Sequence, residues 1–142
     1  MRILGIDFGE KRIGLALSDP LGITAQGLET LMRRNKAQMF KDLKIICENR
    51  QVSQIVIGLP INMDGSIGPK AKEILDLVPQ LEKGLSVPVR TWDERLTSRQ
   101  AGRLMIEENL SRSKQRAQSD RLAATLILQN YLESKRNFTG EQ

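Results

Sequence analysis

Apolar positions along the chain follow the alternating spacing of strands at first, and later the spacing of helix faces and short buried strands. Strands are predicted at residues 2–8, 12–18, 24–31, 55–59 and 87–92. Helices are predicted at residues 35–49, 69–83 and 119–134, and from a cap at Thr97 or Ser98 to Asn109. Three strands followed by alternating helices and strands predict an α/β domain in which helices cover a mixed sheet.

The length and residue types restrict the possible chemistry. A chain of 142 residues and 16.0 kDa corresponds to one domain, which we expect over residues 1–136 before a flexible tail at residues 137–142. With no histidine and one cysteine, the chain excludes a Ser-His-Asp triad, a Cys-His pair, an internal disulfide and an ordinary zinc site. Any bound metal must be held by oxygen atoms, which favours Mg²⁺ or Mn²⁺.

The charge balance favours an anionic partner. The formal net charge is +5, and the isoelectric point is near 9.7. Nucleic acid is the commonest partner of such a domain, although a solvated basic surface gives the same balance. The sequence begins without a signal-peptide pattern and has no long apolar run, and the lone Cys47 suits a reducing compartment. We therefore expect a cytoplasmic protein without a membrane partner, either a monomer or a homodimer.

Three places carry acidic residues that the apolar pattern does not explain. Asp7 interrupts the first strand on the face opposite to its apolar neighbours, either as a functional carboxylate or as an acceptor for the hairpin backbone. Asp93 and Glu94 follow the strand at residues 87–92, where open α/β sheets bind ligands, or they simply precede a helix start. Asp120 opens the last predicted helix on its sheet-facing stripe, or it serves only the helix dipole.

These carboxylates can converge at one place beside the sheet. Carboxylates that lie together repel one another, and cations relieve that repulsion. Two divalent ions, roughly 3.5–4 Å apart, clamp the attacking and leaving oxygens in many enzymes that cleave phosphodiesters. The pattern therefore indicates a Mg²⁺ or Mn²⁺ site for phosphodiester cleavage.

Basic residues gather around the later acids and predict contacts with phosphates, although a solvated helix surface is the alternative. The candidates for nucleic-acid binding are Arg95, Arg99, Arg103, Arg112, Lys114, Arg116 and Asn62. Residues 111–118 are expected to form a basic, flexible loop, and Asn62 belongs to a turn-rich loop at residues 60–68. Aromatic residues make up only 4% of the chain, so recognition of the backbone is favoured over base stacking.

Four motifs give the chain a family resemblance. In order, they are RILGIDFGEKRIGLALSD, IVIGLPINMDGSIGP, VPVRTWDERLTS and SDRLAATLILQNYL, and together they span residues 2–132. In order and spacing they resemble the YqgF-type family, whose members are RNase H-like domains assigned as Holliday junction resolvases or pre-16S rRNA nucleases. The resemblance implies an RNase H-like fold with a five-stranded mixed sheet flanked by helices.

The same resemblance assigns roles to particular residues. It implies that Asp7, Glu94 and Asp120 are the catalytic and metal-binding carboxylates, with Asp93 beside them. RNase H-like enzymes often carry a fourth acid one turn along the last helix, and Ala123 and Ala124 occupy that region here. The site is therefore expected to contain three acids.

Three hypotheses about function follow. The first is a metal-dependent endonuclease that processes the 5′ end of pre-16S rRNA, and cleavage of branched DNA as a Holliday junction resolvase is the same chemistry on another substrate. The second is a non-catalytic nucleic-acid-binding factor in transcription or ribosome maturation. The third is an ATPase or sugar kinase of the actin type, which starts with the same D-x-G motif but needs two such domains.

Overall fold

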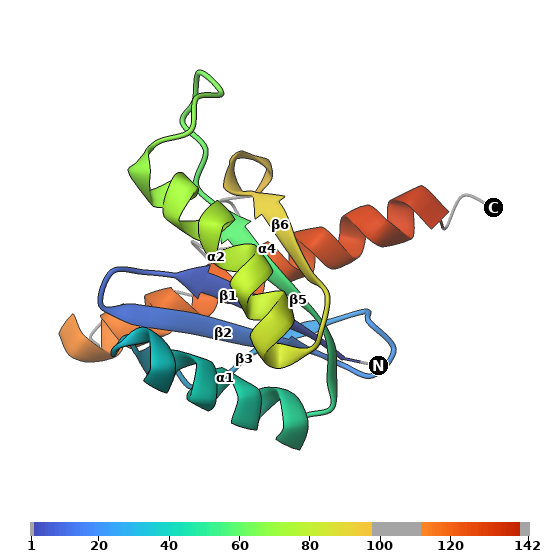
Figure 1. The fold of residues 1–142 in the computed structure, drawn as a ribbon. Helices are drawn as coiled ribbons and strands as arrows, with labels where there is room; N and C mark the ends of the chain where they lie inside the picture. Colours follow the sequence, from blue (N-terminus) through green and yellow to red (C-terminus); the bar gives the residue numbers. More distant parts are fainter. Residues whose placement is uncertain (1, 98–111, 140–142) are drawn as a thin grey trace.

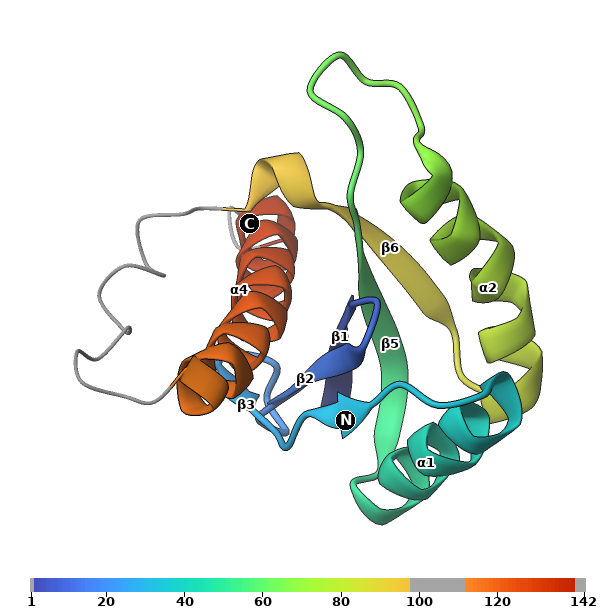
Figure 2. The same ribbon diagram turned by 90° about the vertical axis from the view of Figure 1, so that its left-hand side faces the viewer.

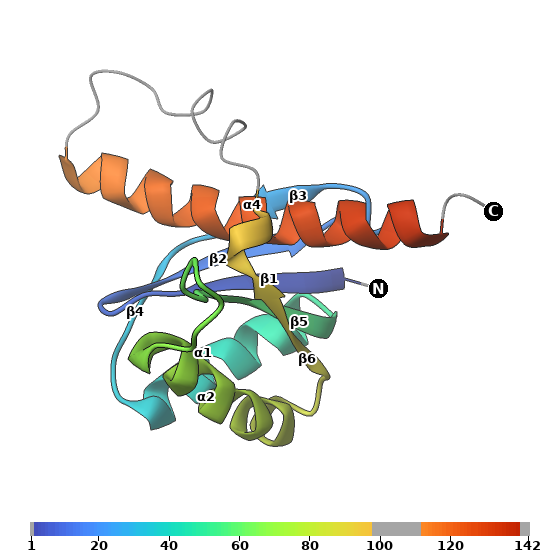
Figure 3. The same cartoon turned by 90° about the horizontal axis from the view of Figure 1, so that it is seen from above.

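The computed structural model describes the backbone of residues 2–97 and 112–139, and the side chains of residues 2–97 and 121–135. In chain order its elements are β1 (Arg2–Phe8), β2 (Arg12–Ser18), β3 (Ala25–Gly27), β4 (Leu31–Met32), α1 (Lys36–Asn49), β5 (Val52–Leu59), α2 (Pro69–Leu85), β6 (Val89–Asp93), the short 3-10 helix η1 (Glu94–Leu96) and α4 (Arg112–Thr139). Helices α1 and α2 cover one face of a central sheet, and the long helix α4 crosses the other (Figures 1 and 3). The predicted α/β class is therefore confirmed.

The described sheet has six strands, one more than the family resemblance implied: its order is β3-β2-β1-β5-β6, and β4 also pairs with β2. Strands β1 and β2 form an antiparallel hairpin, while β5 runs parallel to β1 and β6 runs parallel to β5. The three parallel strands therefore end at the same edge of the sheet, which we call the carboxyl edge.

The third predicted strand is broken. Residues 24–31 contain β3 and the first residue of β4, which pair with different parts of β2. Between them the N–H of Leu28 still donates to the carbonyl of Leu15 at 2.8 Å, and the register against β2 then shifts by one residue before Leu31. Three other strand boundaries also move: β5 begins at Val52 rather than Ile55, and β6 runs over Val89–Asp93 rather than 87–92.

Alternation along the strands separates two hydrophobic cores, one on each face of the sheet. Figure 2 shows α4 on one side of the strands and α1 and α2 on the other. Leu4, Ile6 and Phe8 of β1 lie in the core under α1 and α2, whereas Ile3 lies in the core under α4. Cys47 of α1 lies in the first core, and its burial, with the nearby charge of Glu48, raises the pKa of its thiol to about 11.

Helices α1 and α2 begin where their sequence signals predict. The Asn35 side chain accepts a hydrogen bond from the backbone N–H of Gln38 at 2.8 Å and so caps α1. Pro69 is the first residue of α2, where its missing N–H leaves no hydrogen bond unmade. None of the helices in the described ranges is long and apolar enough to cross a membrane.

Helix α4 is longer at both ends than the sequence predicts. It begins at Arg112 rather than near residue 119, so residues 112–118 are helical and not a flexible loop. Asp120 consequently lies beyond the first two turns of the helix, outside the reach of the N-terminal dipole effect. The last turn of α4 reaches Thr139 and overlaps the expected tail. The helix predicted to end at Asn109 lies outside the described residues.

Candidate active site

Asp7 lies near the carboxyl edge of β1, on the face of the sheet that α4 covers. Ile3, four residues earlier in β1 and so on the same face as Asp7, belongs to the core under α4. The neighbouring residues Ile6 and Phe8 belong to the core under α1 and α2. The strand pairing places Asp7 opposite Gly14 of β2, and the side chain is partly buried. The face expected from the period of two is therefore confirmed.

Glu94 reaches the same region from β6. It is the first residue of η1, directly after the strand, and its side chain is partly buried. It packs over Gly58 of β5: a Cβ atom at Gly58 would lie 3.2 Å from the Cγ and Cδ atoms of Glu94 and 2.6 Å from Cδ1 of Ile127. The missing side chain at Gly58 therefore makes the space that Glu94 occupies between β5 and α4.

Glu94 and Asp7 lie near enough for the charge of one to shift the pKa of the other. Burial raises the pKa of Glu94, the negative charge of Asp7 raises it further, and Asp93 adds a smaller increase. Lys70 opposes these effects and lowers the pKa of Glu94. Two carboxylates with this mutual repulsion form a site that is stabilised when a cation binds.

Asp93 has a different environment from Glu94, although the two are adjacent. Its carboxylate accepts hydrogen bonds from Nε and Nη2 of Arg95, at 3.1 and 2.8 Å, and from the backbone N–H of Arg95 at 2.9 Å. These hydrogen bonds lower the pKa of Asp93. Asp93 therefore caps η1 and holds Arg95, while the helix start that the alternative invoked at Thr97 or Ser98 leads into residues outside the described ranges.

Asp120 is placed by the backbone of α4 alone. Ala124 and Ile127, which share its predicted stripe, are buried against the sheet. A Cβ atom at Gly5 would lie 3.2 Å from the carbonyl oxygen of Ala124, so α4 approaches β1 very closely there. Asp120 stands one turn before Ala124 on that stripe. Its side chain lies outside the described residues, and its place in the site stays a prediction.

Of the residues predicted to contact nucleic acid, only Arg95 and Asn62 have side chains that the structure describes. The Arg95 side chain is bound to Asp93, with an Nη2 to Oδ2 distance of 2.8 Å, and Asn62 helps to close the loop at residues 60–68. Arg99 and Arg103 lie outside the described residues. Three further candidates lie on the first turns of α4, with side chains outside the described set: Arg112, Lys114 and Arg116.

Sequence reasoning missed Lys70. It is the second residue of α2, exposed, and near enough to Glu94 to lower its pKa. The available signal was Pro69, which marks a helix start directly after the loop that follows β5. A lysine in the first turn of that helix lies at the carboxyl edge.

The acid pair fits a divalent cation by its donor chemistry. Asp7 and Glu94 supply carboxylate oxygens, the ligands that Mg²⁺ and Mn²⁺ prefer. Within residues 2–97 and 121–135, no group of three or more acidic or cysteine side chains is arranged to hold a metal ion. A third protein ligand would have to come from elsewhere in the chain, and Asp120 is the candidate that the sequence provides.

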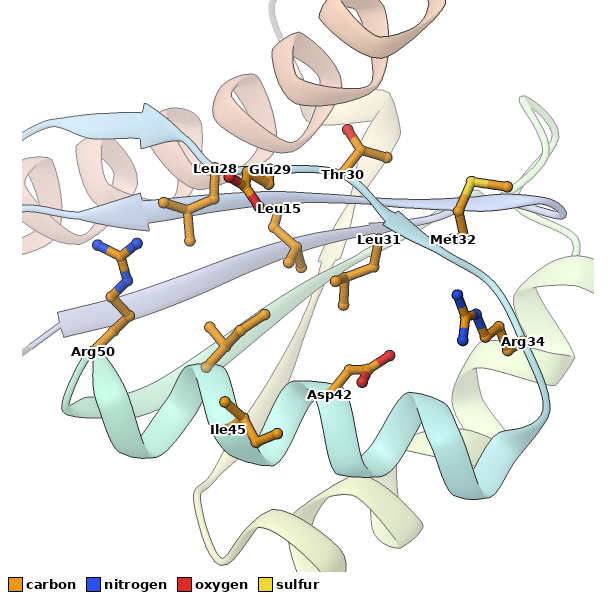
Figure 4. A pocket seen from close by; sticks show the side chains of 11 residues that line it. Leu15, Leu28, Glu29, Thr30, Leu31, Met32, Arg34, Asp42, Ile45 and Arg50 are labelled. Carbon is orange, nitrogen blue, oxygen red and sulfur yellow. The ribbon is translucent and has the colours of Figure 1, made fainter.

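Two cavities of the described structure lie on the other face of the sheet. One of about 450 Å³ opens between α1 and the β2–β4 edge, with Leu15, Leu31 and Ile45 among its lining residues (Figure 4). A second, of about 440 Å³, lies between α1 and α2 beside Phe8 and Leu77. Neither is lined by Asp7 or Glu94.

Comparison with known proteins agrees with this geometry. Residues 1–134 match the model of the family RuvX, described as Holliday junction resolvase. A protein of Clostridium acetobutylicum named "Putative pre-16S rRNA nuclease" is 51% identical over 134 residues, covering 94% of this chain and 99% of its own. A protein of the same name from the Hall strain of Clostridium botulinum is 47% identical over 134 residues, covering 94% of this chain and 98% of its own.

Solved structures establish the fold. Thermus thermophilus RuvC superposes with a TM-score of 0.59 at 14% identity, over 96% of this chain and 97% of its own. The fowlpox virus Holliday junction resolvase gives a TM-score of 0.56 at 12% identity, over 94% of this chain and 99% of its own. The RNase H-like fold implied by the family resemblance is therefore confirmed.

Proposed function

This chain belongs to the RuvX family, the YqgF-type family of the sequence resemblance, and we propose that it is a metal-dependent endonuclease of structured nucleic acid. Its proposed substrate is the 5′ region of pre-16S rRNA, in keeping with the name of its relatives, and its proposed location is the cytoplasm. The observation that carries the proposal is the pairing of the partly buried Glu94 with Asp7 at the carboxyl edge. Nothing in a purely structural role requires two repelling carboxylates to share one partly buried place.

We assign a role to each of these residues from its position. Asp7 and Glu94, with Asp120 from α4, would hold Mg²⁺ or Mn²⁺. When bound, such an ion polarises the phosphate and activates the attacking water. Lys70 supplies a positive charge beside Glu94 and would contact a phosphate of the substrate. The Asp93–Arg95 pair fixes the turn that presents Glu94.

Branched DNA is the second candidate substrate, because the matched family model is described as Holliday junction resolvase. The acid pair serves both substrates equally, since hydrolysis of RNA and of DNA backbones needs the same charge stabilisation. A non-catalytic role in nucleic-acid binding would leave these acids without a chemical task. One experiment can therefore test both which substrate is cleaved and whether these acids are required for cleavage.

The experiment compares Asp7→Asn, Glu94→Gln and Asp120→Asn with the wild type on a precursor 16S rRNA fragment and on a four-way DNA junction, in Mn²⁺, Mg²⁺ or EDTA. Each variant should lower the cleavage rate by at least about 100-fold, more than the loss of a group that only orients a metal ligand. Asp19→Asn is the matched control, because Asp19 accepts backbone hydrogen bonds in the β2–β3 turn, away from the site. Metal-independent cleavage, or full activity in Glu94→Gln, would contradict the proposal.

A further inference from the structure

Arg33 contacts the turn that joins β1 to β2, residues 9–11. It follows β4 directly, in the segment that runs past this turn toward α1 (Figure 3). Its Nη1 donates a hydrogen bond to the carbonyl of Gly9 at 3.1 Å, and its backbone N–H donates to the carbonyl of Lys11 at 2.9 Å. One residue therefore holds both ends of the turn. Asp7 lies only two residues before Gly9, so the turn begins directly behind the acid pair.

The same side chain packs on Phe8, the residue between Asp7 and the turn. The Cζ atom of Arg33 lies 4.1 Å from the centre of the Phe8 ring, in cation–π geometry. Phe8 belongs to the core under α1 and α2, and both residues line the cavity of about 440 Å³ between these helices. Arg33 therefore restrains the end of β1 from the face opposite to Asp7.

A salt bridge joins Arg33 to α2 as well. Its Nη2 lies 3.0 Å from Oε1 of Glu73, and the two side chains are 26% and 52% exposed. An ion pair this exposed adds little stability, so its value lies in the geometry that it imposes. Glu73 stands one turn after Lys70, the lysine whose charge acts on Glu94. Arg33 thus connects the turn behind Asp7 with the helix start beside Glu94.

The chemistry of arginine suits this double contact. Two nitrogen atoms of one planar guanidinium bind Gly9 and Glu73, which belong to different elements. A lysine ammonium is a single point on a flexible stem and cannot fix two partners in the same way. The turn itself is tight, because a Cβ atom at Gly9 would lie 2.5 Å from the carbonyl oxygen of Arg12. Little slack therefore separates the guanidinium from Asp7.

We propose that Arg33 is a positioning residue for the acid pair: it fixes the turn behind Asp7 and, through Glu73, ties that turn to the start of α2. This inference rests on the proposed nuclease function and adds a residue that acts on the metal site only through Asp7. Functional side chains have to be held to within about 0.5 Å of their working geometry. Loss of a group that orients a metal ligand typically weakens metal binding by about 10–100-fold.

The test measures Mn²⁺ binding to the substrate-free protein by electron paramagnetic resonance, and then kcat and KM for cleavage. Arg33→Met keeps an unbranched side chain over Phe8 and removes the guanidinium. It should weaken Mn²⁺ binding by about tenfold or more, and excess Mn²⁺ should restore cleavage. The KM for the nucleic acid and the salt dependence of its binding should not change, because no phosphate contact is lost. In EDTA the amide hydrogen of Gly9 should exchange faster than in the wild type.

Milder variants separate the two contacts. Arg33→Lys keeps the charge but cannot hold Gly9 and Glu73 together, so it should recover only part of the Mn²⁺ affinity. Glu73→Gln should cause a smaller loss than Arg33→Met, and adding it to Arg33→Met should cause no further loss, since both changes break one connection. Arg34→Met is the matched control, because it removes the same charge from the neighbouring exposed residue, and it should bind Mn²⁺ as the wild type does.

The outcomes distinguish this inference from the proposed function. Wild-type Mn²⁺ affinity in Arg33→Met, or an equal loss in Arg34→Met, would overturn the positioning role and leave the nuclease proposal standing. A raised KM in Arg33→Met with full recovery in Arg33→Lys would make Arg33 a phosphate contact and would overturn it too. If Arg33→Met does not fold, unchanged Mn²⁺ affinity in both Arg33→Lys and Glu73→Gln would have the same meaning. A wild-type protein that binds no Mn²⁺, or binding that survives in Asp7→Asn and Glu94→Gln, would contradict both proposals.

Discussion

The two faces of the sheet carry hydrophobic cores of different size and different closest contacts. Under α1 and α2, large aliphatic side chains interdigitate, and Leu43 of α1 is only 2% exposed among them. Under α4 the core is smaller, and glycine or alanine stands at its closest contacts, with Gly5 and Gly58 on the strands and Ala124 on the helix. Polar chemistry is concentrated on this second face, where Asp7 and Glu94 meet.

The difference shows how a small domain can hold repelling carboxylates. Small residues bring α4 close to the sheet and leave room for Glu94, but they bury less apolar surface than leucine or isoleucine. The large core on the opposite face offsets this loss, because both faces share the same strands. Substitutions on the two faces should therefore separate stability from activity.

The largest effect on stability is expected from Leu43→Ala on the α1 face. Removing this buried side chain should lower the free energy of unfolding by about 2–5 kcal/mol, because a cavity is left in a closely packed core. Ile45→Ala is the control on the same helix, since Ile45 is 49% exposed and should lose much less. Urea unfolding measures both values. Cleavage per folded molecule should stay at the wild-type level in Leu43→Ala, and a large fall would show that the two faces are not separable.

A smaller effect on stability, with a larger one on activity, is expected from Gly58→Ala. The new methyl group would lie 2.6 Å from Ile127 and 3.2 Å from Glu94, so Ile127 must shift and Glu94 must give by a few tenths of an ångström, at a cost of about 1–3 kcal/mol. Displacement of Glu94 should reduce cleavage by at least about tenfold, since catalytic geometry tolerates little error.

Gly84→Ala makes the same chemical change on the other face. Its methyl group would meet the ring of Phe40 at 2.8 Å, and alanine favours the helix by about 1 kcal/mol, so the net change in stability should be small. Cleavage should be unaffected. Equal losses of activity in the two glycine variants would refute the special role of the space at Gly58.

The sequence predicted the elements whose signals are local. Asn35 and Pro69 mark helix starts by their own chemistry, and the period of two in β1 placed Asp7 on the correct face. The sequence-based prediction was wrong where contacts between distant parts of the chain determine the structure. Residues 112–118 carry no apolar stripe and were expected as a loop, yet they continue the helix that packs over the sheet. The third strand is broken where its pairing register against β2 shifts by one residue, between Gly27 and Leu31.

The candidate site was predictable as a set of acids and not as a geometry. Spacing and resemblance selected Asp7 and Glu94, and the structure brings them together. The opposite environments of Asp93 and Glu94 could not be read from two adjacent acids. They follow from the turn of η1, in which Asp93 binds Arg95 while Glu94 enters the space over Gly58.

The smallest expected effects come from these two neighbouring acids in the metal-free protein, and they should have opposite signs. The pKa of Glu94 is raised above its ordinary value of 4.5, so folding is penalised increasingly as the pH rises through the raised pKa. Glu94→Gln removes that penalty and should raise the thermal midpoint in EDTA at pH 7, with the difference vanishing at pH values below about 4.5.

The pKa of Asp93 is lowered, so its negative charge stabilises the fold at pH values above its ordinary pKa of 3.8. This stabilisation is lost as the pH falls through the lowered pKa. Asp93→Asn should therefore lower the midpoint slightly at pH 7, by no more than a surface ion pair contributes. Thermal unfolding of both variants from pH 4 to 8 in EDTA measures the two signs. A midpoint for Glu94→Gln below that of the wild type at pH 7 would mean that Glu94 has a stabilising partner, and the comparison between the two faces would lose its electrostatic basis.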